Sequence, residues 1–257
     1  MCVIVRDGKM RKIELLNSVL RKFRFEVLRH NENEISVLQN QYKWLQALKI
    51  RTVLDIGANV GSFSEKIHRI LPESAIVAIE PLRECAGALR RIADRIPSMT
   101  VIQKAVGENI GEAEFFHRAF TPSSSLLPMD RVHVVSFPYS VPSSKERVSV
   151  STLDALLEHR GLNSRILAKI DVQGYEFRVL RGARKTLPRI DVFLIETSYF
   201  PLYKEQSYFR EVFEYLSERG FVFLGNFDQM KSPAIGVNLQ GDAIFVNKET
   251  YHDLASL

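Results

Sequence analysis

The sequence has little cysteine and no long apolar run. Its 257 residues include two cysteines, Cys2 and Cys85. Two cysteines cannot cross-link a fold of this size or form a metal cluster, and such sparse use is typical of a reducing compartment, so we expect a cytoplasmic protein. No stretch approaches the roughly 18 apolar residues of a membrane-spanning helix. The apolar part of the first residues, MCVIVRDGKMRK, is too short for a secretory signal.

The overall composition is that of an ordinary globular protein. Apolar residues make up 46% and charged residues 25% of the chain, which excludes a disordered or fibrous protein. The sequence contains no internal repeat, and its length fits one large domain or two small ones.

Positive charge is concentrated at the N-terminus. Residues 1–30 contain eight of the 35 Lys and Arg but three of the 30 Asp and Glu, so they carry the whole formal charge of +5. A nucleic-acid enzyme usually spreads basic residues along its binding face, and we therefore expect no nucleic-acid partner. Apolar residues recur at steps of three and four from Ile13 to Val27 and predict a helix. This helix either packs on the body or contacts an anionic membrane surface or substrate.

Strand and helix patterns alternate after a second predicted helix at 34–49. Strands are predicted at 52–57, 75–81, 100–106, 111–116, 146–152, 166–172, 192–198, 221–227 and 242–247. Helices are predicted at 62–71, 82–96, 153–161, 176–187 and 207–220. We expect an α/β, Rossmann-like fold with a mostly parallel sheet, helices on both faces and an antiparallel C-terminal edge. The strands at 111–116 and 146–152 are expected to pair antiparallel around a Pro/Ser-rich loop. The predicted domains are a basic helical extension, 1–50, and a catalytic domain, 51–257.

The first strand-to-helix turn is the expected ligand site, because ligands of such sheets bind beyond the strand carboxyl ends. The turn reads DIGANVGSFS and starts at Asp55, which can accept hydrogen bonds. Gly57 and Gly61 allow a tight turn and a close backbone approach. A dinucleotide signature would also need glycine where Asn59 and Ser62 stand. An NAD-dependent oxidoreductase is therefore the alternative enzyme rather than the first one.

Glu80 ends the second predicted strand, 25 residues after Asp55. A carboxylate there can hold two ribose hydroxyls through charge-assisted hydrogen bonds, each worth roughly 1.5–3 kcal/mol. Rossmann dehydrogenases share this feature, so Glu80 alone does not separate the two enzyme classes.

Six segments together resemble the ordered motifs of the FkbM family of methyltransferases across about residues 52–200. They are DIGANVGSFS, AIEPLRECAGALRR, QKAVGENIGEAEF, SVSTLDALL, AKIDVQGYEFRVLRGARKTL and LIETS. The resemblance implies a class I methyltransferase fold, S-adenosylmethionine as cofactor, and O-methylation of a hydroxyl on a glycan or natural product. The cofactor contacts that it implies are Asp55, Gly57, Asn59, Gly61, Ser62, Glu80, Pro81, Ala105 and Asp171. The chain departs from the family's D-V-E-G with Gln173 in DVQG, which leaves the role of this position open.

Methyl transfer to a hydroxyl requires removal of the acceptor's proton by a general base or with the help of a metal. Asp171 and Glu196 lie at the carboxyl ends of the fourth and fifth predicted parallel strands. Neighbouring strands are about 4.8 Å apart, so both carboxylates could face one pocket. One hypothesis makes either carboxylate the base, with a pKa raised by mutual repulsion. The other makes the pair ligands of Mg²⁺, but the sequence offers no third ligand and we do not favour a metal.

His117 precedes the Pro/Ser-rich loop at 121–144, and His133 lies within it. Imidazole suits base catalysis near neutral pH, although a lone loop histidine is more often a surface residue. The loop itself is either a plain connection or an acceptor-contacting lid. A non-catalytic module on the same fold is the third function class, and it would bind the cofactor without transferring a methyl group.

Overall fold

The computed structural model describes residues 41–118, 121–140 and 143–256. Contacts divide the chain into two units, Met1–Ala47 and Leu48–Leu257. The described part of the first unit contains helix α3 (Lys43–Ala47), which lies within the helix predicted at 34–49. The helix predicted from Ile13 to Val27 lies outside the described residues.

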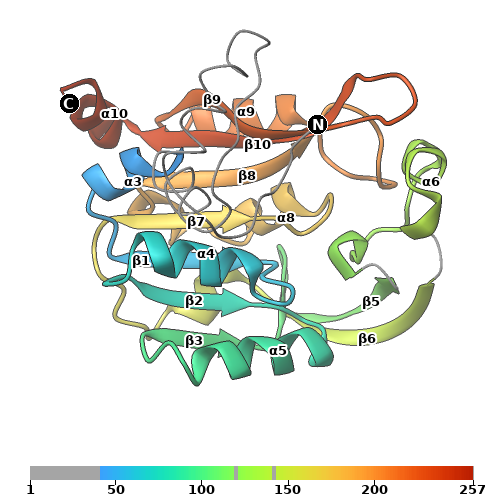
Figure 1. The fold of residues 1–257 in the computed structure, drawn as a ribbon, viewed down its shortest axis with the longest axis horizontal. Helices are drawn as coiled ribbons and strands as arrows, with labels where there is room; N and C mark the ends of the chain where they lie inside the picture. The colour runs from blue at the N-terminus through green and yellow to red at the C-terminus, as the bar shows by residue number, and fades with distance from the viewer. Residues whose placement is uncertain (1–40, 119–120, 141–142, 257) are drawn as a thin grey trace, which may run out of the picture. The chain divides into compact units, whose positions relative to one another are not determined.

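The second unit is built on a seven-stranded sheet with the strand order β3-β2-β1-β7-β8-β10-β9 (Figure 1). Its strands are β1 (Thr52–Ile56), β2 (Ala75–Ile79), β3 (Met99–Ile102), β7 (Ile166–Ile170), β8 (Val192–Ser198), β9 (Phe221–Lys231) and β10 (Asn238–Asn247). The first five pair in parallel. β10 runs antiparallel to both β8 and β9. The predicted parallel sheet with an antiparallel C-terminal edge is confirmed.

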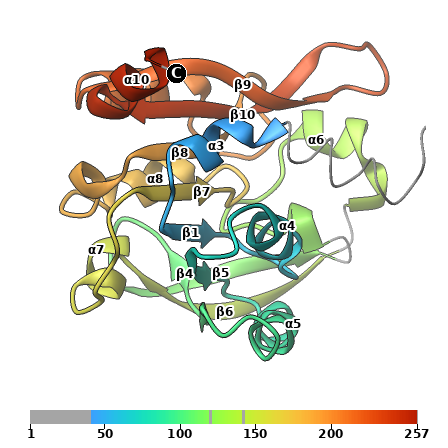
Figure 2. The same ribbon diagram turned by 60° about the vertical axis from the view of Figure 1, so that its left-hand side comes forward.

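Helices cover both faces of this sheet. From β1 the chain proceeds outward through β2 to β3, and from β7 it proceeds to β8 in the other direction. Right-handed crossovers therefore place α4 (Ser62–Ile70) and α5 (Arg83–Ala93) on one face and α8 (Glu176–Arg181) on the other. Figure 2 shows α4 and α5 on one side of the strands and α7 (Leu153–Leu157) on the opposite side.

The main core lies on the face of α7, α8 and α9 (Phe209–Ser217). Leu54 and Ile56 of β1 pack there with Leu180 of α8 and Leu216 of α9. Since side chains alternate along a strand, the intervening Asp55 points to the other face, where α4 lies. This alternation decides where the first predicted site residue is found.

A smaller sheet has the order β4-β6-β5. It contains β4 (Ala105–Val106), β5 (Gly111–Arg118) and β6 (Ser143–Ser151), and the predicted antiparallel pair is confirmed as β5 and β6. The strand predicted at 100–106 is divided between the two sheets. β3 ends in the main sheet, the chain bends at Gln103 and Lys104, and β4 then pairs with β6.

Three other expectations were incomplete. The helix predicted at 176–187 ends at Arg181. The next residue, Gly182, packs so closely on the preceding loop that a Cβ atom there would lie 2.0 Å from the Gly107 carbonyl oxygen. The predicted loop contains a short helix, α6 (Arg131–Ser136), and the chain ends with α10 (Lys248–Ala255). Among the described residues, no helix is long and apolar enough to span a membrane.

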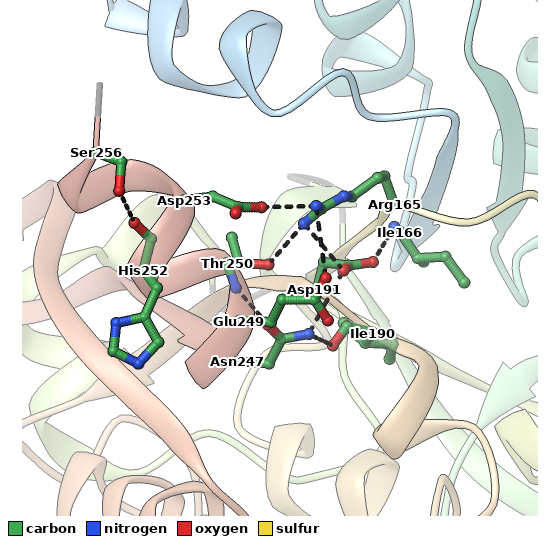
Figure 3. Close-up of polar contacts among 10 residues, drawn as sticks. All are labelled: Arg165, Ile166, Ile190, Asp191, Asn247, Glu249, Thr250, His252, Asp253 and Ser256. Carbon is green, nitrogen blue, oxygen red and sulfur yellow. Dashed lines mark hydrogen bonds and ion pairs between the residues drawn. The ribbon is translucent and has the colours of Figure 1, made fainter.

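A polar cluster fastens α10 at the amino ends of β7 and β8 (Figure 3). Arg165 donates a hydrogen bond to Asp253 over 2.6 Å, and its guanidinium lies 3.8 Å from the Asp191 carboxylate. Asn247 caps α10 by accepting a hydrogen bond from the Thr250 N–H over 2.8 Å. We call these five residues the amino-end cluster.

Candidate active site

A cavity of about 220 Å³ opens at the carboxyl ends of β1, β2, β7 and β8. Its far wall comes from residues 121–140, which we call the α6 segment. Among the sequence-predicted site residues, those in the cavity wall are Gly57, Asn59, Glu80, Pro81, Ala105, Asp171 and Glu196. Asp55, Gly61 and Ser62 lie close by but are not part of the wall.

Glu80 is held in the wall by the backbone around it. Its Oε2 accepts a hydrogen bond from the Asn59 N–H over 2.9 Å, and its Oε1 accepts one from the Leu82 N–H over 3.0 Å. Burial raises the pKa of Glu80 to about 7, although these two hydrogen bonds oppose the rise. Each carboxylate oxygen can accept a second hydrogen bond, so Glu80 can still receive hydroxyl groups from a ligand.

The two predicted glycines are required by packing inside the protein. Both have positive φ, 80° at Gly57 and 92° at Gly61. A Cβ atom at Gly57 would lie 1.9 Å from the Asp171 carbonyl oxygen, so the chain leaving β1 touches the chain leaving β7. A Cβ atom at Gly61 would lie 2.4 Å from the Ile92 Cδ1 atom of α5. Gly57 therefore brings Asp171 next to the turn after β1.

Asp55 stands behind the wall. It is fully buried, and its Oδ2 accepts a hydrogen bond from the Ser64 hydroxyl over 2.6 Å. Its Oδ1 lies 3.9 Å from Lys169 Nζ. Burial raises the pKa of Asp55, and the charge of Lys169 opposes the rise. The structure thus connects Asp55 to the cavity through Lys169, which bonds to Asp171.

A bridged pair of carboxylates lies at the centre of the site. The Gln173 amide nitrogen donates hydrogen bonds to Asp171 Oδ1 over 2.7 Å and to Glu196 Oε2 over 2.8 Å. The Gln173 oxygen accepts a hydrogen bond from the Tyr203 hydroxyl over 2.7 Å. A glutamate at this position would add a third negative charge, whereas the amide joins the two carboxylates. We call Asp171, Gln173, Glu196, Tyr203 and Lys169 the central cluster.

The remaining oxygens of the two carboxylates are also occupied. Asp171 Oδ2 accepts a hydrogen bond from Lys169 Nζ over 3.0 Å, and Glu196 Oε1 accepts one from the Gln240 amide. Desolvation, and then the charge of Asp171, raise the pKa of Glu196 well above its ordinary value. Burial alone would lower the pKa of Lys169, but Asp171 and Asp55 raise it above the ordinary value.

Sequence reasoning missed several members of this site. Lys169 precedes Asp171 by two residues and shares its side of the strand, so period-two alternation could have identified it. Gln240 is on β10, the antiparallel neighbour of β8, and its place depends on strand pairing. Within the described ranges, no group of three or more His, Cys, Asp or Glu side chains is arranged to hold a metal ion.

The two candidate histidines have different surroundings. The Nε2 atom of His117 lies 2.9 Å from a carboxylate oxygen of Glu84, outside the cavity wall. His133 on α6 is part of the wall and is 3% exposed. The expectation of a surface residue was therefore wrong for His133, because the α6 segment folds over the strand ends.

Comparison with known proteins identifies related sequences. A model of the methyltransferase FkbM domain matches residues 55–223. The 2-O-methyltransferase NoeI of Sinorhizobium fredii (strain NBRC 101917 / NGR234) is 25% identical over 175 residues, which cover 64% of this chain and 70% of NoeI.

Solved structures give a more distant likeness. Methyltransferase FkbM from Methylobacillus flagellatus KT is 14% identical with a TM-score of 0.48; the match covers 77% of this chain but 44% of that chain. A human methyltransferase 10 domain containing protein is 10% identical with a TM-score of 0.44, covering 95% of this chain and 98% of that one.

Proposed function

This chain belongs to the FkbM methyltransferase family, and from this premise we propose that it transfers a methyl group from S-adenosylmethionine to a hydroxyl of a sugar, a glycan or a secondary metabolite. The observation that carries the proposal is the carboxylate-lined cavity at the strand ends, with Glu80 on one side and the Asp171–Glu196 pair on the other. The name of NoeI, a 2-O-methyltransferase, supports oxygen as the methylated atom.

The wall residues fit this cofactor in charge and in shape. Glu80 presents carboxylate oxygens suited to a ribose diol, next to apolar side chains of Ile79, Leu82 and Val106 that suit a purine ring. Asp171 and Glu196 supply negative charge suited to a sulfonium. When bound, the cofactor supplies a methyl group activated by its positive sulfur. Asn59 and Pro81 line the cavity next to Glu80. Asp55 lies behind the wall and affects the cavity through its ion pair with Lys169.

The strand order suggests a division of work between the two carboxylates. Asp171 touches the turn after β1 at Gly57, so it faces the cofactor side. Glu196 is one strand further and contacts Gln240, so it faces the acceptor side. A base works best when its pKa lies near the working pH. We assign proton acceptance to Glu196, whose pKa is raised, and the positioning of the sulfonium charge to Asp171.

Two measurements test the proposed function. Calorimetry should detect binding of S-adenosylhomocysteine and none of NAD; the reverse result would favour an oxidoreductase. A screen with labelled methyl donor should then find turnover on at least one of a set of methyl glycosides, lipid-linked glycans and polyketide alcohols. Binding of S-adenosylhomocysteine without turnover on any of them would favour a non-catalytic module.

The basic segment 1–30 supports a separate proposal about a partner. Because it carries the whole formal charge of +5, it would contact an anionic membrane surface. Full-length protein should sediment with anionic liposomes, whereas a chain lacking 1–30 should not. Equal sedimentation of the two would contradict the proposal.

A further inference from the structure

His133 is buried in the cavity wall, and its ring nitrogens have no hydrogen-bond partner in the part of the chain that the structure describes. The residue is 3% exposed, and neither Nδ1 nor Nε2 has a hydrogen-bond partner among the described residues. A buried polar atom left unpaired costs about 1–3 kcal/mol. An imidazole facing a cavity therefore favours a ligand that supplies the missing hydrogen bonds.

The imidazole is firmly placed beside the central cluster. Its ring packs edge to face against Phe137 at 5.4 Å and against Tyr203 at 5.1 Å between ring centroids. The same Tyr203 donates its hydroxyl hydrogen to Gln173. α6 is tied to this region by the Asp130 N–H, which donates to the Leu202 carbonyl oxygen over 2.8 Å. His133 thus lines the cavity beside Tyr203, whose hydroxyl binds the bridging Gln173.

Burial in the cavity wall keeps this imidazole neutral. Burial, and then the charge of Arg118, lower the pKa of His133 to about 4. A neutral imidazole has one N–H donor and one acceptor nitrogen, on opposite sides of the ring. A hydroxyl group can pair with either nitrogen, because it can both donate and accept a hydrogen bond.

The rest of the wall is unsuited to an anionic acceptor. Lys104 is the one Lys or Arg among the described residues that line the cavity, and its Nζ donates to the Ser149 hydroxyl over 2.9 Å. Three carboxylates, Glu80, Asp171 and Glu196, line the same space. The wall thus offers an anionic acceptor group one cationic side chain, which already binds Ser149, whereas a neutral compound with several hydroxyls needs no cationic partner.

We propose that His133 binds the methyl acceptor directly, through a hydrogen bond between one of its ring nitrogens and an acceptor hydroxyl. The acceptor is accordingly a neutral polyhydroxylated compound, a sugar unit above all. This inference rests on the proposed function and adds the residue that recognises the acceptor.

A binding experiment tests the inference without turnover. The protein is labelled with ¹³C at histidine Cε1, saturated with S-adenosylhomocysteine, and titrated with the methyl pyranosides of glucose, galactose and fucose. The histidine signal that is missing in His133→Phe should shift with at least one sugar, and the same shift should persist in the control His117→Asn. If S-adenosylhomocysteine binds but no sugar moves this signal, the inference is overturned. If S-adenosylhomocysteine itself does not bind, it is the proposed function that fails.

Kinetics of the variants provide the second readout. With an acceptor that the wild type methylates, His133→Phe should raise KM by about tenfold or more, the equivalent of about 1.4 kcal/mol. His133→Asn keeps a donor and an acceptor and should recover part of this loss. Affinity for S-adenosylhomocysteine should stay within about twofold in both variants. A fall in kcat at unchanged KM, or a matching loss of S-adenosylhomocysteine affinity, would contradict an acceptor-binding role.

Discussion

Two clusters of charged side chains lie at opposite ends of β7 and β8, and they differ in how deeply they are buried and in what they face. In the amino-end cluster, the Arg165 guanidinium lies against Asp191 and Asp253, and Asn247 caps α10 by accepting a hydrogen bond from the Thr250 N–H. In the central cluster, Lys169 alone faces both Asp171 and Asp55, with Glu196 beside them.

The difference separates a structural network from a functional one. The amino-end cluster lies at the protein surface, where the Asp253 side chain is 45% exposed, and it joins the last helix to the sheet (Figure 3). The central cluster is largely buried and faces a cavity, where burial raises the pKa of Glu80 to about 7 and that of the nearby Asp242 to about 6. Raised carboxylate pKa values around a cavity are typical of sites that bind a cation or move a proton. The four predictions below test this contrast.

The largest expected effect is on turnover, through Glu196→Gln. Removing a general base typically slows a reaction by about 100-fold or more, so kcat of the variant should fall by at least that factor. Its affinity for S-adenosylhomocysteine, measured by calorimetry, should stay within about threefold of wild type. Turnover within threefold of wild type would show that Glu196 does not accept the proton.

Gln173→Glu should convert the bridged pair into a cluster of three carboxylates. Like charges raise the pKa of the new acid in the folded state, so the folded protein binds more protons than the unfolded chain once the pH exceeds about 4.5. Stability relative to wild type should therefore fall as the pH rises from 5 to 8, by about 2 kcal/mol in total.

Urea unfolding at several pH values measures this effect. The matched control is Gln103→Glu, because Gln103 accepts a hydrogen bond from exposed Arg90 and a carboxylate there meets an opposite charge. A pH profile that is the same for Gln173→Glu and wild type would contradict the account of position 173.

Glu80→Gln should weaken cofactor binding by about tenfold. The substitution replaces a charged acceptor by a neutral amide, and a charge-assisted hydrogen bond contributes about 1.5–3 kcal/mol. Glu84→Gln is the control, since Glu84 is on α5 and pairs with His117 outside the cavity wall. Calorimetry with S-adenosylhomocysteine measures the affinity of each variant. Equal affinities of the two variants would show that Glu80 does not bind the cofactor.

Arg165→Met tests the amino-end cluster and should have the smallest effect. The Arg165 side chain is 29% exposed, so losing its ion pairs should cost about 1 kcal/mol of unfolding free energy. Turnover per folded molecule should not change, because this cluster lies at the other end of the strands. A fall in turnover per folded molecule would show that the amino-end cluster also contributes to the site, and would contradict this distinction between the two clusters.

Local sequence patterns were sufficient to predict the strands and the turn on which the candidate site is built. Continuous apolar strands and the turn DIGANVGSFS predicted the parallel sheet and its ligand-binding end, and the ends of β7 and β8 predicted Asp171 and Glu196 at neighbouring positions. These features follow from residues close together in the chain, where side-chain periodicity and strand length are directly visible.

What the amino-acid sequence determined by itself is therefore the family, the sheet and the two carboxylates. The tertiary structure decided which groups surround them: Gln173 bridges the pair, Gln240 reaches Glu196 from an antiparallel strand, and His133 is buried by the α6 segment. The physical reason is that burial and hydrogen-bond partners are set by segments far apart in sequence. The pKa values of Glu196 and His133 depend on desolvation and on charges that only folding brings near them.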